Sequence, residues 1–211
     1  MKAYHWLKSD MTSGAGGEKP WTIGETRTIK GEIELCERGY HSSKSFYDAL
    51  RYAPGAMACI VEVSGETIKG GYKKTSSTRK LIDASDATKV LMEFDIDCAE
   101  RVLPNFEKYY PNDGRPREAI KAARDFNKGL ITQVELLASE AASEAAAKAA
   151  SWSASWAAKE ARSAKRSAAR SAARSALWAS EAARLAAWSA EVKWQKQHLN
   201  MLMEELFKEP V

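Results

Sequence analysis

The stretch from residue 138 to residue 190 is nearly half alanine and contains no glycine and no proline. Alanine has the highest intrinsic helix propensity, and the Arg, Lys and Glu residues between the alanines follow closely. The stretch therefore predicts a long α-helix. A helix in a protein gains most of its stability from packing, so the rest of the chain or another chain has to cover one of its faces.

The flanks of this stretch indicate where the helix begins and ends. Thr132 and Glu135 have the spacing of a capping box, in which each side chain bonds the backbone N–H of the other residue. Pro210 is the next residue that breaks helices. Unbroken, roughly 75 residues would span about 110 Å. A turn in the serine-rich segment 151–155 would instead make a helical hairpin, and both arrangements remain open.

Two opposite faces of the helix are predicted to pack. The small face includes Ala168 and Ala172, and the other face carries Trp152, Trp156, Trp178 and Trp188. Each indole ring buries roughly 200 Å² when it is covered, so tryptophans left in water would forgo several kcal/mol each. We therefore expect packing in a bundle or in a homo-oligomer of coiled-coil type.

The same helix carries a basic stretch that suggests an alternative. Its cations could neutralise the phosphates of a nucleic acid, and the net charge of +4 permits such a partner without demanding it. The residues concerned are Arg162, Arg166, Arg170 and Arg174. No membrane contact is expected, because the face opposite the cations is alanine and no stretch of about 18 uncharged apolar residues exists.

The first hundred residues have the mixed patterns of a small α/β domain. Strands are predicted over Ala3–Leu7, Gly31–Cys36 and Ala58–Val63, of which the last is expected to be central. Ser45–Tyr52 predicts a short helix. Residues 65–77 suggest a hairpin or a mobile loop, and 78–82 a further strand.

Helical spacing of apolar residues begins near Asp86 and ends at Val102. Pro116 suits the first turn of another helix, and Gly129 is placed to end it. The expected fold is α+β, with a domain over residues 1–103, a linker over 104–115 and a helical region over 116–209.

One segment, Cys36 to Ser43, concentrates groups that could bind a ligand. A glycine that permits a tight turn is followed by an aromatic ring, an imidazole and two hydroxyls. Structural roles remain open, because His41 could be a buried packing residue and the serines could cap the next helix. The candidate ligand-binding residues are His5, Arg38, Tyr40, His41, Ser42, Ser43 and Tyr52.

Several classes of site are not expected. Three cysteines at wide, irregular spacing fit neither a disulfide framework nor a zinc site, and reduced thiols are typical of a cytoplasmic protein. Three histidines are too few to predict a histidine-rich metal site. No hydrolase elbow or phosphate loop is present, so we predict no metal, no cofactor and no catalytic residue. The first residues lack the apolar core of a signal peptide, which also favours the cytoplasm.

Three motifs stand out in the first hundred residues: Leu35-Cys36-x-x-Gly39-Tyr40-His41, Asp48-Ala-Leu-x-Tyr52 with Pro54, and Val61-Glu62-Val63-x-Gly65. Through these motifs, residues 1–100 resemble a family of uncharacterised phage and bacterial proteins. The resemblance implies an origin in a phage or a bacterium and no particular activity.

The order strand, Gly-Tyr-His-Ser-Ser, helix, strand is also similar to the ADP-ribosyltransferase fold, in which such a strand end lines a nicotinamide pocket. The similarity implies pocket roles for His5, His41 and Ser43. It does not extend to the catalytic acid, because Glu62 lies inside a strand and Glu32 and Glu34 come too early. A pocket for a nucleotide-like ligand could survive without catalysis.

The segment PREAIKAARDFNKG runs from Pro116 to Gly129 and is followed by Ala-Ala repeats. With these features, residues 116–190 resemble the alanine-rich helical segments of bacterial putative immunity proteins. We therefore predict a non-enzymatic binding or inhibitor protein of bacterial conflict, encoded by a phage or a bacterium and acting in defence or in counter-defence. Its partner would be a nucleotide-like small molecule or a host or phage protein. The alternatives are an enzyme of the ADP-ribosyltransferase type and a structural protein that associates with nucleic acid.

Overall fold

The computed structural model describes residues 1–13, 18–136 and 170–208, and within 170–187 it describes the backbone alone. The chain divides into two compact units, Met1–Phe94 together with Trp194–Val211, and Asp95–Lys193. The described strands all lie in the first unit, and helices make up the described part of the second. The predicted α+β class is confirmed.

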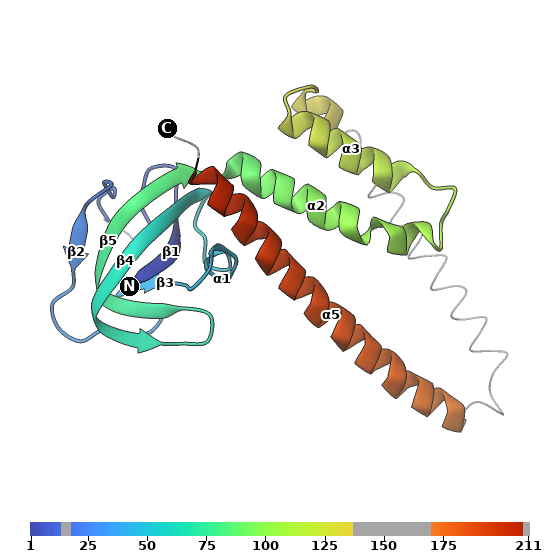
Figure 1. Cartoon of the computed structure of the whole chain (residues 1–211), viewed down its shortest axis with the longest axis horizontal. Helices are drawn as coiled ribbons and strands as arrows, with labels where there is room; N and C mark the ends of the chain where they lie inside the picture. Colours follow the sequence, from blue (N-terminus) through green and yellow to red (C-terminus); the bar gives the residue numbers. More distant parts are fainter. Residues whose placement is uncertain (14–17, 137–169, 209–211) are drawn as a thin grey trace. The chain divides into compact units, whose positions relative to one another are not determined.

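The first unit is built on an antiparallel sheet in the order β1 (Lys2–Leu7), β4 (Met57–Lys69), β5 (Lys74–Asp86) and β2 (Thr26–Thr28). A further short strand, β3 (Tyr40–Ser42), also pairs with β5. Figure 1 shows β4 and β5 as a long, curved hairpin. The apolar segment 58–63 lies in β4 between two neighbours, so the predicted central strand is confirmed.

The sheet curls until two of its distant parts meet. The register of the β4–β5 hairpin shifts between Ile60 and Val61 and again between Ser64 and Thr67, and such irregularities bend a strand. Tyr4 on β1 and Ser43, just after β3, then exchange two backbone hydrogen bonds of 3.0 and 2.9 Å. The curl therefore encloses an interior between β1, β4 and β5.

Alternation along the strands decides which side chains enter this interior. Successive side chains of a strand point to opposite faces, so Ala3, His5 and Leu7 of β1 share one face. Its apolar core contains Ala3, Leu7, Trp21, Cys59, Val61, Val63 and Leu81. Arg79 stands opposite Val63 in the β4–β5 pairing and is also buried. The cation of Arg79 therefore lies at a buried position next to an apolar core residue.

The short helix α1 (Phe46–Leu50) begins where the sequence predicts. Ser45 caps it, because the Ser45 hydroxyl accepts a hydrogen bond from the Asp48 N–H at 3.1 Å. The Phe46 ring lies 4.4 Å from the Tyr4 ring and 5.9 Å from the Trp6 ring. The helix thus covers the outer face of β1.

The last turns of α5 (Arg170–Leu206) belong to the same unit as the sheet. Leu199 and Met203 are completely buried. The Lys196 ammonium pairs with the Asp48 carboxylate of α1 at 2.6 Å. Phe207, just beyond the helix, stacks on Phe46 with 5.6 Å between ring centres. The C-terminal end of the chain therefore completes the packing around α1.

The second unit contains most of α2 (Thr88–Glu107) and all of α3 (Arg115–Asn127). Helix α2 continues through Pro104, beyond the Val102 at which the sequence pattern ends. Arg124 of α3 pairs with two α2 carboxylates, Asp97 at 3.0 Å and Glu100 at 2.7 Å. These ion pairs tie α3 to α2.

The predicted end of α3 and the predicted start of the next helix are both confirmed. Gly129 has a φ of 73°, the left-handed conformation that commonly ends a helix. The Thr132 N–H donates to the Glu135 carboxylate at 2.8 Å, and the Glu135 N–H donates to the Thr132 hydroxyl at 3.4 Å. The backbone is helical over 133–136, where this described range ends.

One predicted strand is wrong, and the structure decides between the two alternatives for residues 65–77. Residues 31–36 do not form a strand, because Glu34 and Arg38 bond each other's backbone groups and close a tight turn. The alternation of Ile33 and Leu35 therefore falls on a loop. Residues 65–77 are a hairpin, whose turn is closed by a hydrogen bond of 2.8 Å from the Gly70 N–H to the Lys73 carbonyl.

Much of the alanine-rich stretch lies outside the described residues. This applies to Trp152, Trp156, Arg162, Arg166 and Ala168, and to the side chains of Arg170, Ala172, Arg174 and Trp178. The backbone from Arg170 onward is helical, as predicted. In the described part of the chain, no helix is both long and apolar enough to cross a membrane.

Candidate functional site

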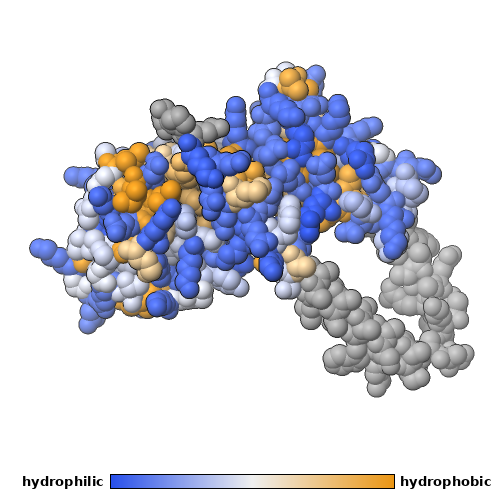
Figure 2. Space-filling model, in the orientation of Figure 1, coloured by the Kyte–Doolittle hydropathy of each residue, from blue (hydrophilic) through white to orange (hydrophobic). Residues whose placement is uncertain are grey.

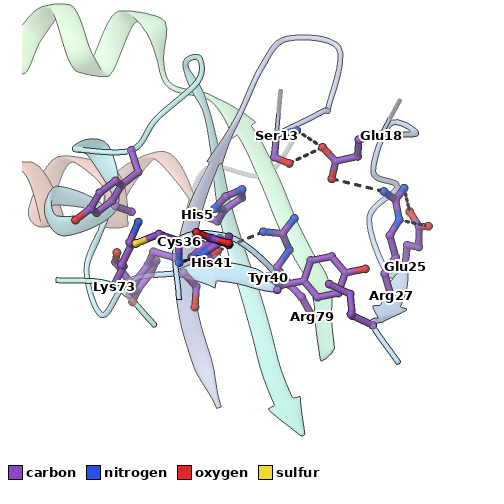
Figure 3. A pocket seen from close by; sticks show the side chains of 18 of the residues that line it. His5, Ser13, Glu18, Glu25, Arg27, Cys36, Tyr40, His41, Lys73 and Arg79 are labelled. Atoms are coloured by element: carbon purple, nitrogen blue, oxygen red, sulfur yellow. Dashed lines mark hydrogen bonds and ion pairs between the residues drawn. The ribbon is translucent and has the colours of Figure 1, made fainter. Parts of the chain in front are cut away.

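A cavity of about 670 Å³ opens in the first unit, beside the segment 39–43. Its walls come from β1, β3, β5, α1 and the chain between residues 18 and 37. Six of the seven candidates from the sequence line it, namely His5, Tyr40, His41, Ser42, Ser43 and Tyr52. Figure 3 shows His5, Tyr40, His41 and Arg79 grouped around it.

The seventh candidate, Arg38, does not line this cavity. Its guanidinium donates to the Lys30 carbonyl at 2.8 Å. The next residue, Gly39, has a φ of 133°. A side chain at this position would overlap the Thr75 hydroxyl of the adjacent strand. The glycine of the motif is therefore required for the close approach of β3 to β5.

His41 is held by its own loop. The Cys36 N–H donates to His41 Nε2 at 3.0 Å, which leaves the ring proton on Nδ1. Cys36 adopts a φ of 78°, unusual for a residue with a side chain. Burial lowers the pKa of His41, and the positive charges of Lys73 and Arg79 lower it further. The ring is neutral at pH 7 and fixes the loop.

His5 reaches the same cavity from β1. Its pKa lies well below 6.5, chiefly because of burial and then because of the positive charge of Arg79. The Nε2 atom is buried and has no hydrogen-bond partner among the described residues. A neutral imidazole with one unoccupied ring nitrogen can donate to or accept from a bound ligand.

Arg79 is the most buried charged group of the site, and sequence reasoning missed it. The residue is 2% exposed. Its guanidinium lies 4.3 Å from the Trp21 ring and 5.0 Å from the Tyr40 ring, and it donates to the His41 carbonyl at 3.3 Å. Burial lowers its pKa to about 10, so the group keeps its charge at pH 7.

A second arginine lies on the Trp21 ring, and it differs from Arg79 in being paired. The Arg27 guanidinium lies 4.1 Å from the ring and bonds the Glu25 carboxylate at 2.7 Å. It also lies 3.8 Å from the Glu18 carboxylate, which in turn accepts a hydrogen bond from the Trp21 indole at 2.8 Å. Figure 3 shows Glu18, Arg27 and Glu25 at the right of the view, away from His5 and His41.

Tyr52 and Lys73 form another part of the cavity wall. The Lys73 ammonium lies 4.3 Å from the centre of the Tyr52 ring, which is a cation–π contact. Tyr52 is 48% exposed. Aromatic rings and cations thus surround a polar floor. No cluster of metal-ligating side chains occurs within the described ranges.

The buried histidine predicts acid sensitivity. The pKa of His5 is lower in the folded protein than in the unfolded chain, so below pH 6.5 the unfolded chain binds a proton that the folded protein does not bind. The free energy of unfolding is therefore retained above that pH and decreases below it. We expect the thermal midpoint to drop between pH 7 and pH 5, and to drop less in His5→Gln. The check is a series of melting curves for both proteins. Parallel pH profiles would contradict a neutral, buried His5.

Comparison with known proteins gives two family matches. Residues 1–93 match a domain of unknown function (DUF7666). Residues 82–202, more than half of the chain, match the family described as Imm-5 like putative immunity protein. Neither the curated proteins nor the solved structures contain a match. The chain therefore belongs to the family described as Imm-5 like putative immunity protein.

Proposed function

We propose that this protein protects a bacterium by binding and neutralising a harmful protein, without catalysis of its own. The observation that carries the proposal is the family match over residues 82–202, which covers α2, α3 and α5 from Arg170 to Leu202. The sequence points to the same role through its resemblance to immunity proteins in 116–190. Both the inhibitor function and the direct contact with the harmful protein are part of this proposal.

The surface of the second unit supports a protein partner. Large apolar side chains are exposed there, including Tyr109, Leu130, Val134 and Trp188, with exposed fractions from 69% to 76%. Figure 2 shows a mostly hydrophilic surface over α2 and α3, interrupted by small hydrophobic areas. Aromatic anchors set among charged residues are typical of surfaces that bind proteins.

The N-terminal cavity is proposed as a separate ligand site. Its volume of about 670 Å³ lies in the range of small-molecule pockets. Aromatic rings at its wall would suit a flat, nucleotide-like molecule, and the same opening could receive a side chain of a protein partner. Of the seven ligand-binding residues predicted from the sequence, the six that line the cavity are proposed to contact this ligand.

Oligomerisation through the long helix remains a further proposal. Trp188 is 69% exposed in the single chain, which fits a tryptophan that a second copy covers. We expect light scattering to give a mass above the 23.3 kDa of the monomer, and Trp188→Ser to shift the equilibrium towards monomer. The same monomeric mass for both proteins would contradict assembly through this residue.

The protein partner is tested by purification from the organism that produces the protein. Native mass spectrometry of the isolated material should reveal a second protein in stoichiometric amount. A mass that fits only copies of this chain, at several salt concentrations, would count against the proposal. The same spectrum would reveal any small molecule that remains bound.

An enzyme of the ADP-ribosyltransferase type is the second candidate, because His5, His41 and Ser43 do line one cavity. Two of the acids in that cavity wall are already engaged, since Glu25 pairs with Arg27 and Glu18 accepts from Trp21. Incubation with NAD distinguishes the two functions. Release of nicotinamide that is lost in a variant of the cavity would favour the enzyme over the binder.

A further inference from the structure

Arg79 carries a charge in the interior of the first unit. Only 2% of the residue is exposed, and no carboxylate of the described residues lies within ion-pair distance of its guanidinium. Burying a charge is unfavourable unless the charge is paired and hydrogen-bonded. The Nε atom of Arg79 is buried and has no hydrogen-bond partner in the described part of the protein.

The neighbours of Arg79 compensate its charge only in part. The Trp21 and Tyr40 rings offer their π faces, and the His41 carbonyl accepts one hydrogen bond. Glu18 is the nearest source of negative charge, but its carboxylate is bonded by Ser13, Trp21 and Arg27. The guanidinium therefore retains donor capacity inside a cavity that is open to solvent.

Two other buried polar atoms of the cavity lining also lack hydrogen-bond partners among the described residues. They are the Nε2 atom of His5 and the hydroxyl oxygen of Ser42, and both residues line the cavity. Figure 3 shows the Arg79 guanidinium directed towards His5 and His41. Native proteins leave few buried polar atoms without a hydrogen-bond partner, so several such atoms in one cavity call for an explanation. A ligand that bonds them is such an explanation.

Two cations of the cavity lining, Arg79 and Lys73, have no carboxylate partner among the described residues. Burial lowers the pKa values of both His5 and His41, and the positive charge of Arg79 lowers them further. Lys73 adds a second cation at the wall. The nearby carboxylates of Glu18 and Glu25 are turned to Arg27 instead. An anion at the floor would thus meet cations and donors.

We propose that this cavity binds the phosphate group of a small molecule, with Arg79 as the main anchor and with Ser42 and His5 as additional hydrogen-bonding partners. A guanidinium binds phosphate through two parallel hydrogen bonds. The number of donors favours phosphate over carboxylate, because phosphate presents more acceptor oxygens. The inference rests on the part of the proposed function that makes the cavity a ligand site.

The test is calorimetry on the full chain in a phosphate-free buffer of low ionic strength. The probes are inorganic phosphate, pyrophosphate, AMP and citrate. We expect phosphate-bearing probes to bind and citrate to bind at least about tenfold more weakly. Tighter binding of AMP than of inorganic phosphate would indicate that the rings hold a base, and tighter binding of pyrophosphate would indicate a polyphosphate.

Arg79→Met and Lys80→Met are a matched pair of variants. Lys80 is the next residue of the same strand, is exposed, and does not line the cavity. Each variant loses one positive charge. We expect Arg79→Met to weaken binding of the best probe about 100-fold, as for loss of a charge-assisted pair, and Lys80→Met to change it less than about twofold.

A second readout separates a binding site from a structural arginine. Exchanging a buried, unpaired charge for a hydrophobic side chain is often neutral or stabilising, so Arg79→Met should keep the melting temperature of the wild type. The phosphate probe should raise the melting temperature of the wild type and not that of the variant. If Arg79→Met does not fold, Ser42→Ala provides the test, with an expected loss of about tenfold in affinity.

The inference is overturned if the folded wild type binds none of the phosphate probes, or if Arg79→Met binds them as tightly as the wild type does. In the second case the anion would occupy another site, such as the lysines near the β4–β5 turn. Capture of the protein partner is measured separately, without added anion. Loss of anion binding with capture intact counts against this inference alone, whereas failed capture counts against the proposed immunity function.

Discussion

Phe46→Ala is expected to lower the free energy of unfolding by about 3–5 kcal/mol, the range for removing a buried aromatic ring. Phe46 is 3% exposed. Its ring contacts the Tyr4 ring at 4.4 Å and the Phe207 ring at 5.6 Å. It therefore joins β1, α1 and the C-terminal end of the chain. The loss would be measured by urea denaturation, as a lower midpoint with an unchanged slope.

Ile23→Ala serves as the control for this variant. Ile23 is also a large apolar residue of the first unit, but it is 55% exposed. We expect a change within about 0.5 kcal/mol, as for most surface substitutions. A loss below about 1 kcal/mol in Phe46→Ala would mean that Phe207 and the end of α5 do not pack on α1.

Leu199→Ala is expected to cost about 2–5 kcal/mol, because it removes a fully buried side chain and leaves a cavity. Leu199 lies one turn from Lys196, which pairs with Asp48 at 2.6 Å, and one turn from the buried Met203. This substitution therefore tests whether a helix that begins far away in the sequence stabilises the N-terminal sheet.

The readout for Leu199→Ala is again the urea midpoint, with Met201→Ala as the matched control. Met201 lies on the same turn of α5 and is 51% exposed. Its replacement should change stability by less than about 0.5 kcal/mol. Equal effects of the two variants would show that α5 has no buried face in this unit.

The sequence predicted the elements whose signals are local. The central strand could be recognised in Ala58–Val63 because both of its neighbours bury it, which produces a nearly continuous apolar run. The cap at Ser45 and the capping box at Thr132 rest on contacts three residues apart. In contrast, Ile33 and Leu35 alternate like a strand although Glu34 and Arg38 close a turn there.

Long-range packing could not be predicted in the same way. The pairing of Lys196 with Asp48 joins residues 148 positions apart, and no periodicity indicates it. The packing partner of the exposed Trp188 could not be predicted either. Its spacing places it on a helical face, but periodicity alone does not identify what would cover that face.

The sequence predicted one part of the candidate site and missed another. The Gly-Tyr-His-Ser-Ser motif identified five cavity-lining residues from Gly39 to Ser43 because they are consecutive. Arg79 was missed, although a signal existed. In the run Thr78 to Ile82, Arg79 falls on the same strand face as the buried Leu81, and a charge at such a position is unusual.

The most direct test of the immunity function is a growth assay. The protein partner identified by mass spectrometry is expressed in a bacterium, alone and together with the full chain. We expect the partner alone to stop growth, and co-expression of the wild-type chain to restore it. A stoichiometric partner that does not harm the cell, or a toxic partner that the chain fails to neutralise, would contradict the proposed function.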